Sequence, residues 1–154
     1  MDPVNLTRYF LLHCDSYEAV HKRFADRFSA TLGRLPGVVE IGSGWRPLVW
    51  EMLECIEKVV VRDNLEVHTI LIKDKFGGLR VRCDIQADDV LKLVNNAIGE
   101  AEKTCEQCGQ PGWLCRKETY RRDVFNGFQV VEVVDYWYKT LCSVHALSSG
   151  YEKA

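Results

Sequence analysis

The chain has 154 residues, of which 47% are hydrophobic, so it can bury a packed core in one domain or in a compact body with a small module. This composition excludes a disordered chain. The formal net charge of -2, with acidic and basic residues interspersed, excludes a global field that would attract nucleic acid or an anionic membrane. Any such binding has to be local.

Cysteine usage and the first residues indicate the compartment. Seven cysteines are an odd number, and the chain starts without a basic region followed by a long apolar core. The apolar run at residues 9–12 is far shorter than a membrane span. We therefore expect a cytoplasmic protein with reduced thiols and no membrane partner, which favours metal over disulfide for paired cysteines.

Two helical patterns occupy the first 32 residues. Residues 6–13 are short and apolar and predict a first helix. Apolar side chains then recur at every fourth position: Val20, Phe24, Phe28 and Leu32. This stripe predicts an amphipathic helix over residues 16–32, with Asp15 as its capping residue and with Gly33 and Pro36-Gly37 as the signals that end it.

The next segment, Gly42-Ser-Gly-Trp45, invites comparison with phosphate-binding loops. It lacks the third glycine and the preceding strand of a dinucleotide-binding fingerprint, and the chain has no Gly-Lys-Ser or Gly-Lys-Thr sequence of a P-loop. We therefore predict a turn that positions Trp45. Pro47 suits the first turn of a helix that would run to about residue 61 with one apolar face.

A β-hairpin and a long helix follow. Residues 65–73 include an apolar run that predicts a buried strand, and residues 79–85 alternate apolar and charged side chains as a second strand does. Gly77 and Gly78 lie in the turn between them. Asp88 complements a helix N-terminus, and the apolar spacing predicts a helix from there to about residue 104.

One face of this hairpin gathers basic side chains beside Phe76: Lys73, Lys75, Arg80 and Arg82. The simpler interpretation is a solvated strand face whose charges are offset by Asp74 and Asp84. The alternative is a ligand-binding patch. An enzyme that uses Asp74, Lys75 or Arg80 is the least favoured option, because the sequence offers no paired acid and base and no nucleophile with an adjacent base.

The last third of the chain carries two pairs of metal-binding residues. Cys105 and Cys108 form a Cys-x-x-Cys pair, and Cys142 and His145 form a second pair with the same spacing. Four such donors suit a tetrahedral zinc ion, and four protein ligands indicate a closed, structural Zn²⁺ site. Gly109 permits the sharp turn of a zinc knuckle, and the second pair would share one face of a helix that starts near residue 143.

Other chemistries fit these cysteines less well. A redox pair would lie at a strand-to-helix junction of a βαβ unit, whereas Cys105 follows a long predicted helix. Cys115 could replace His145 as a ligand, although a small buried hydrophobe is its simpler role. A nucleic-acid deaminase, a His-Glu-x-x-His protease and a His-Asn-His nuclease each need a motif that the chain lacks.

Between the ligand pairs the sequence predicts a hairpin with an Asn126-Gly127 turn. Basic and aromatic residues gather near it: Arg116, Lys117, Tyr120, Arg121 and Arg122. Such a cluster could grip phosphates or an acidic protein surface, although Glu118 and Asp123 dilute its charge. We expect residues 148–154 to form a frayed tail.

Four stretches resemble a set of small uncharacterised proteins from bacteria and their phages. They are Gly42-Ser-Gly-Trp45-Arg-Pro-Leu-Val, Ile72-Lys-Asp-Lys-Phe-Gly-Gly-Leu-Arg80, Cys105-Glu-Gln-Cys-Gly-Gln-Pro-Gly112 and Thr140-Leu-Cys-Ser-Val-His145. The resemblance implies the zinc ligands and a bacterial or phage origin but no catalytic residue. The order of knuckle, hairpin and helix also resembles a treble-clef zinc module, a scaffold that many functions share.

Together these features predict an α+β fold with two parts. Residues 1–104 would form a body of helices packed on a β-hairpin, and residues 105–154 would form a zinc-stapled β-hairpin and short helix packed on that body. We expect a non-enzymatic binding protein that acts on a protein partner, with an inhibitor of a host or defence complex as one case by analogy. The alternative is a nucleic-acid-binding protein that uses the basic hairpin and the basic strand face, and an enzyme is less favoured.

Overall fold

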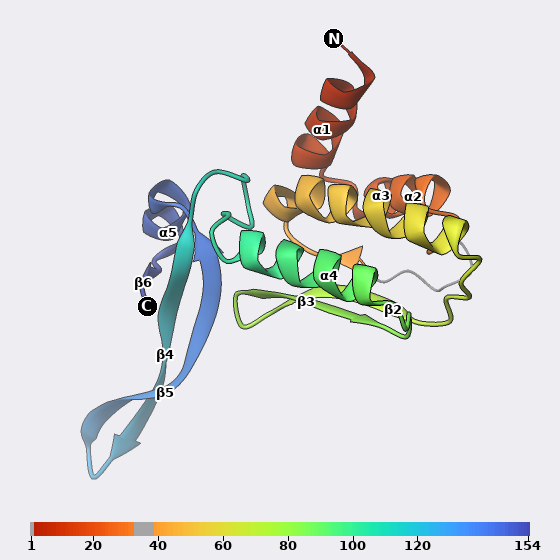
Figure 1. Cartoon of the computed structure of the whole chain (residues 1–154). Coiled ribbons are helices and arrows are strands. Elements are labelled where there is room, and N and C mark those ends of the chain that lie inside the picture. Colours follow the sequence, from red (N-terminus) through yellow and green to blue (C-terminus); the bar gives the residue numbers. More distant parts are fainter. Residues whose placement is uncertain (1, 33–38) are drawn as a thin grey trace.

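The computed structural model describes residues 2–32 and 39–154, which form a mixed α+β fold with two separate three-stranded sheets (Figure 1). The helices are α1 (Pro3–His13), α2 (Tyr17–Arg27), the 3₁₀ turn η1 (Ser43–Trp45), α3 (Arg46–Arg62), α4 (Asp88–Ala101) and α5 (Ser143–Ser149). The strands are β1 (Val39–Glu40), β2 (Ile70–Lys75), β3 (Gly78–Cys83), β4 (Trp113–Phe125), β5 (Phe128–Leu141) and β6 (Glu152–Lys153). The predicted α+β class is confirmed. Among the described helices, none is both long and apolar enough to cross a bilayer.

The first sheet and the helices before and after it build the body. β2 pairs with β3 in antiparallel and with β1 in parallel orientation, and α3 and α4 lie across one face of this sheet (Figure 1). Ile70, Ile72 and Leu79 are buried in the same core as the apolar face of α3. Alternate residues of β2 are buried because only one face of the sheet is covered.

Helix α2 starts and ends differently from the prediction. Its N-cap is Ser16 instead of Asp15, because the Ser16 hydroxyl accepts a hydrogen bond at 3.1 Å from the backbone N–H three residues on. The helix ends at Arg27, before its apolar stripe does. Glu57 of α3 accepts the Ala30 N–H at 3.1 Å, which a continuing helix would bond to the carbonyl four residues back.

The apolar stripe nevertheless reaches the core. Phe28 is fully buried, and its ring meets Trp50 of α3 edge-on with 4.8 Å between ring centroids. Phe24 meets the same indole at 5.2 Å. The predicted end signals of this helix, Gly33 and Pro36-Gly37, lie outside the described residues.

The first hairpin strand begins later than its apolar run suggests. β2 starts at Ile70 instead of residue 65. The Asp84 carboxylate accepts the backbone N–H groups of His68 at 3.2 Å and of Thr69 at 3.0 Å. These N–H groups are therefore held by a side chain and do not enter a strand ladder.

The C-terminal tail is ordered, so the expectation of a frayed end was wrong. α5 ends at Ser149, and Gly150, with a φ of 72°, lets the chain reverse direction. β6 then pairs with β4, and the Ala154 N–H donates to the Leu114 carbonyl at 3.0 Å. Strand pairing, which has no local sequence signature in so short a segment, orders the tail.

The Gly-Ser-Gly-Trp segment joins the body to the C-terminal module. The Gly44 N–H donates to the Glu106 carbonyl at 2.8 Å, and the Ser43 hydroxyl donates to the next carbonyl along at 2.6 Å. The indole N–H of Trp45, a fully buried residue, donates to the Thr104 carbonyl at 2.7 Å. The predicted turn that positions Trp45 is confirmed as η1, and the turn also holds the segment after α4.

Glycine is required in this turn because two backbones touch. A Cβ on Gly44 would lie 2.1 Å from the Cys105 carbonyl oxygen and 2.4 Å from the Gly109 nitrogen. A Cβ on Gly42 would lie 2.2 Å from the Glu106 carbonyl oxygen. Only a residue without a side chain permits so close an approach. The two glycines therefore serve protein packing and do not form a phosphate loop.

A second contact joins the β2–β3 turn to the base of the second sheet. The buried Thr140 hydroxyl donates to the Gly77 carbonyl at 2.7 Å. Gly77 has a φ of 74°, and a Cβ there would lie 2.9 Å from the Lys139 nitrogen. The C-terminal module is thus held to the body at two separate places, the turn η1 and the β2–β3 turn.

We predict that Gly44→Ala destabilises the protein whereas Gly99→Ala does not. The methyl group at position 44 would overlap backbone atoms that cannot move aside, and overpacking of this kind costs about 1–3 kcal/mol. Gly99 lies in α4 with nothing within 4 Å of an added Cβ, so alanine there should stabilise the helix by about 0.5–1 kcal/mol. Urea denaturation followed by circular dichroism measures both effects. Equal midpoints for the two variants would contradict the backbone contact.

Candidate metal centre

The turn after α4 brings Cys105 and Cys108 together. The Cys105 N–H donates to the Gln110 carbonyl at 2.7 Å, and the Gly109 N–H donates to the Cys105 carbonyl at 2.9 Å. These two hydrogen bonds close the turn that carries the two cysteines. Gly109 has a φ of 76°, a conformation that favours glycine, as the predicted knuckle requires.

The second ligand pair lies at the start of α5. Cys142 is the N-cap residue of this helix, and His145 lies in its first turn, so both side chains face the same way. The end of β5 meets the knuckle directly, because the Glu106 N–H donates to the Thr140 carbonyl at 2.9 Å. This backbone contact brings the two ligand pairs to one place.

Four side chains converge there: Cys105, Cys108, Cys142 and His145, whose ligand atoms all lie within 4.8 Å of one another. The sulfurs of Cys108 and Cys142 are 3.8 Å apart. His145 Nδ1 lies 3.5 Å from the Cys105 sulfur and 3.2 Å from the Cys142 sulfur. The three cysteines are free thiols and form no disulfide. The cluster has the composition and spacing to hold a metal ion.

The protein environment shifts the pKa values of two of the ligand thiols in opposite directions. Burial raises the pKa of the Cys108 thiol to about 11. Hydrogen bonding from the His145 backbone N–H lowers the pKa of Cys142 to about 7. In the metal-free chain near neutral pH, Cys108 is therefore protonated while Cys142 is partly a thiolate. A metal ion that binds here has to displace at least the proton of Cys108.

Cys115 does not belong to this cluster. It is fully buried in a small second core with Cys105, Leu141 and Ala146, and its thiol donates to the Trp113 carbonyl at 3.4 Å. Burial raises the pKa of this thiol. The structure therefore favours the role of a small buried hydrophobic residue for Cys115 over the role of a metal ligand in place of His145.

Sequence reasoning missed an ion pair between a buried carboxylate and a half-buried lysine beside the candidate metal centre. Glu106, between the knuckle cysteines, is 3% exposed and pairs with Lys139 of β5. Burial raises the pKa of the Glu106 and Asp74 carboxyl groups, and the charge of Lys139 opposes the shift in both. No local pattern could reveal this pair, because its members meet only when β5 packs against the knuckle.

The three groups considered for an enzyme do not converge. Asp74 is paired with Leu79 on the face of the sheet that the helices cover. Lys75 and Arg80 lie on the outer face, because successive strand residues alternate between faces. An acid and two cations on opposite sides of a sheet cannot act on one substrate.

The predicted basic cluster of the second hairpin is divided between two faces. Strand alternation and register place Arg116, Tyr120 and Arg122 on one face and Lys117 and Arg121 on the other. Three of the cations already have acceptors: Glu152 for Arg116, Asp123 and Glu132 for Arg121, and the Ser149 carbonyl for Lys117. The five residues do not form one basic surface, and a role in binding stays a prediction.

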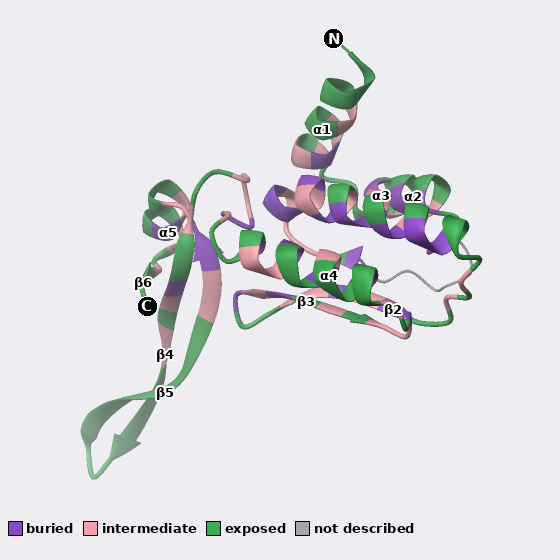
Figure 2. Ribbon diagram, viewed as in Figure 1, coloured by how far each residue is buried: buried purple, intermediate pink, exposed green. Residues whose placement is uncertain are grey.

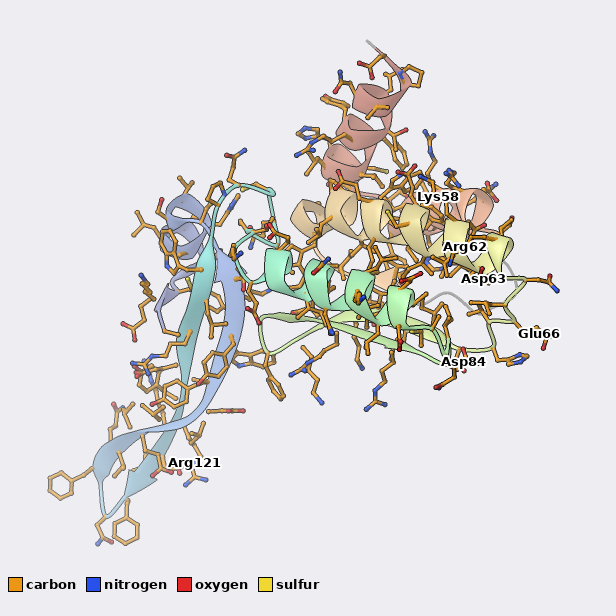
Figure 3. All side chains as sticks on the ribbon, in the orientation of Figure 1. Lys58, Arg62, Asp63, Glu66, Asp84 and Arg121 are labelled. Carbon is orange, nitrogen blue, oxygen red and sulfur yellow. The ribbon has the colours of Figure 1, made fainter. Side chains whose placement is uncertain are left out.

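The basic side chains of the first hairpin do share one face. Lys73 and Arg80 are register partners, and Lys75 and Arg82 are each two residues from one of them. The carboxylates expected to offset them lie elsewhere. Asp74 is on the covered face, and Asp84 binds backbone N–H groups at the far end of the sheet (Figure 3).

We predict that Cys108→Ser removes the metal and unfolds the region after Thr104, as chelation should. The core of the module contains only a few buried residues, so the metal ion has to supply most of its order. Metal content should fall from about one ion per chain to near zero, and the amides of α5 should lose protection from hydrogen exchange. Cys55→Ser, at an exposed thiol, is the matched control and should change neither. Unchanged protease resistance after complete metal removal would contradict the prediction.

We also predict that the affinity for the metal falls as the pH is lowered. Cys108 has a pKa of about 11, so its proton must leave on binding at any pH near neutrality, which gives at least about tenfold weaker binding per pH unit. Below about pH 7 the decline should steepen, because Cys142 then holds a proton too. Competition with a chromophoric chelator of known pH dependence measures the effect. An affinity that does not vary with pH would exclude thiolate ligation.

We compared the chain with known proteins by three searches. A scan against protein-family models gave no match, and searches of curated proteins and of solved structures gave none either. The metal centre is therefore supported by its donor set and distances, and the function by the surfaces that the fold presents.

Proposed function

We propose that the ion held by the four ligands is Zn²⁺ in a closed structural site. In a tetrahedron with zinc–sulfur bonds of about 2.3 Å and zinc–nitrogen bonds of about 2.0–2.1 Å, two sulfurs lie about 3.8 Å apart and a sulfur and a nitrogen about 3.6 Å apart. The Cys108–Cys142 distance of 3.8 Å and the Cys105–His145 distance of 3.5 Å fit these values, and the Cys142–His145 distance of 3.2 Å is shorter. Thiolate and imidazole donors favour zinc over magnesium or calcium, and four protein ligands leave no position for a substrate.

The order of knuckle, β4–β5 hairpin and α5 supports a treble-clef-like module around this ion. Structural zinc sites contribute about 10–16 kcal/mol to folding in small zinc domains. That is ample for a segment whose own core is a handful of side chains. The role of the zinc is then to fix the base of the hairpin.

We propose that the protein is a non-enzymatic binding protein that engages a protein partner with this hairpin. Every residue from Tyr120 to Trp137, called here the arm, is exposed. The arm extends away from the body and is exposed along its outer length (Figures 1 and 2). A two-stranded hairpin that projects alone is only marginally stable in water. The length of the arm is therefore better explained by a function in binding than by a contribution to stability.

One face of the arm carries exposed valine and tyrosine side chains. Residues opposite each other in register lie on the same face, which places Tyr120 beside Val133. The valine–tyrosine face consists of Tyr120, Val124, Val131, Val133 and Tyr136, whose exposed fractions range from 37% to 73%. A contiguous exposed face of this kind is typical of protein interaction sites, and it is the observation that carries the proposal.

The charges beside this face indicate the chemistry of the partner. Arg122 lies on the same face, and it makes no ion pair within the described part of the chain. Arg116 lies over the Tyr136 ring at 5.4 Å. Tyrosine and arginine dominate the binding energy of many interfaces. The partner that fits is a protein with an apolar patch flanked by a carboxylate, and a host complex is the case that the resemblance to phage proteins suggests.

Nucleic acid is a second candidate for the arm and fits less well. Arg121 pairs with Glu132 at 2.6 Å and with Asp123 at 2.8 Å, so its charge is already balanced. Phosphate binding depends on cations that are free to replace counterions. Arg122 alone meets that requirement in the arm, against five apolar or aromatic side chains on the same face.

We predict that Val131→Glu/Val133→Glu abolishes partner binding and leaves the fold intact. Burial of a valine side chain is worth about 1.5–3 kcal/mol, so loss of two should weaken binding by more than about a hundredfold. Proteins that co-purify with the tagged chain from bacterial extract would be quantified by mass spectrometry, and the affinity of the best one would be measured by calorimetry.

Two further variants make this experiment specific. Phe128→Glu/Val130→Glu adds the same charge to the same strand on the opposite face and should retain the partner. A chain in which residues 119–135 are replaced by Asn-Gly, so that the register partners Glu118 and Tyr136 flank a tight turn, should keep its metal and lose the partner. Equal recovery of the partner by all variants would exclude the arm as the binding site. Self-association lost with the arm would identify the partner as a second copy.

A further inference from the structure

The outer face of the first sheet is open and positively charged. α3 and α4 cover one face of β1–β2–β3, and no described element lies against the other (Figure 1). The cationic face consists of Lys73, Lys75, Arg80 and Arg82 around Leu71. These side chains line a depression of about 470 Å³. The surface is therefore basic and continuous across two strands.

The four cations have no partners within the described chain. None of them forms an ion pair with a carboxylate there, whereas Arg27, Arg62, Arg116 and Arg121 elsewhere do. Glu40 is the register neighbour of Lys73 in β1 and does not pair with it. Asp74 and Asp84 are engaged on the covered face and at the sheet end. The charge of this face is thus uncompensated.

The register makes this pattern costly for the fold. Lys73 stands directly opposite Arg80, and like charges at opposed positions destabilise a strand pair. A charge pattern that stabilises a strand pair places opposite charges at opposed positions. The arm has this pattern, because Arg121 stands opposite Glu132 and pairs with it. In the first sheet like charges are opposed, which does not help folding. A bound ligand explains its cations better.

An exposed aromatic ring stands at the end of this face. Phe76 is 70% exposed in the β2–β3 turn and has a φ of 54°, which is rare for a bulky residue. Neither packing nor turn propensity explains a phenylalanine there. The Lys75 ammonium group lies 5.4 Å from the ring centroid. A strained, exposed residue beside a charged surface points to a function in binding.

We propose that the cationic face and Phe76 bind single-stranded nucleic acid. The four cations would contact successive phosphates, and the Phe76 ring would stack on a base at the end of the track. An exposed ring can stack on a base only where base faces are open, which favours a single strand over a duplex. An acidic protein segment would use the cations but has no use for the ring. This site lies on the first sheet, whereas the arm belongs to the second sheet. Binding at this site does not depend on the partner of the arm.

Fluorescence anisotropy with labelled oligothymidylate and oligouridylate of about 15 nucleotides tests the proposal. With about four phosphates neutralised, the logarithm of the binding constant should fall with that of the salt concentration with a slope of about -2.8. Lys73→Gln/Arg80→Gln should weaken binding at least about tenfold at low salt and reduce the slope to about -1.4. Both residues are on the surface, and unchanged metal content and circular dichroism would show that the variant is folded.

The aromatic contribution has a different signature. Phe76→Ala should weaken binding by about 5- to 100-fold without changing the salt slope, because stacking releases no counterions. Phe76→Trp should retain the affinity. The matched charge control is Lys58→Gln/Lys92→Gln, which removes one exposed lysine from α3 (Lys58, Figure 3) and one from α4, the helices that cover the other side of the sheet. This control should leave binding unchanged.

Four outcomes would overturn the proposal. They are no binding at low salt, equally tight binding of duplex, competition by polyglutamate as strong as that by oligothymidylate, and an equal loss in the lysine control. The arm variant Val131→Glu/Val133→Glu should bind the oligonucleotide normally. Failure of the nucleic-acid site and failure of the proposed protein partner are therefore distinguished by separate variants.

Discussion

The last third of the chain depends on four ligand side chains that meet within 4.8 Å of one another. The strands and helix that carry them enclose a core of very few buried residues, too small to hold a long hairpin in one orientation. One bound ion would replace that missing core. The hairpin is thereby fixed where β4 leaves the knuckle and where β5 returns to it, while its outer part needs no support from the body.

The turn that carries Cys105 and Cys108 is also the surface on which the body docks. Gly42 and Gly44 touch the backbone of the knuckle, and Trp45 holds the residue before it, so the position of the module is set by atoms immediately beside the ligands. The ion pair of the buried Glu106 with Lys139 adds an electrostatic contact at the same junction. Loss of the metal would therefore loosen the contact between the two parts as well as the module itself.

This arrangement presents two surfaces with different chemistry. The arm offers exposed valine and tyrosine side chains with its charges largely paired, which suits a protein. The outer face of the first sheet offers unpaired cations and one exposed ring, which suits an extended polyanion. The turn that carries Phe76 also contacts the base of the second sheet through Gly77 and Thr140. The two surfaces are thus held in a fixed relation by the same junction.

Local pattern alone predicted the four side chains that cluster at the candidate metal centre, the amphipathic helices and the hairpin of the first sheet. Ligand spacing and hydrophobic periodicity act over a few residues, so they survive in the sequence without knowledge of the fold. The tertiary structure decided where those elements stop and which charges are paired. α2 ends early because Glu57 reaches it from α3, and the tail is ordered because β6 meets β4. The basic residues of the two hairpins look alike in sequence, and only strand register shows that Arg121 faces Glu132 while Lys73 faces Arg80. Contacts between distant segments depend on register and packing, which no local pattern encodes.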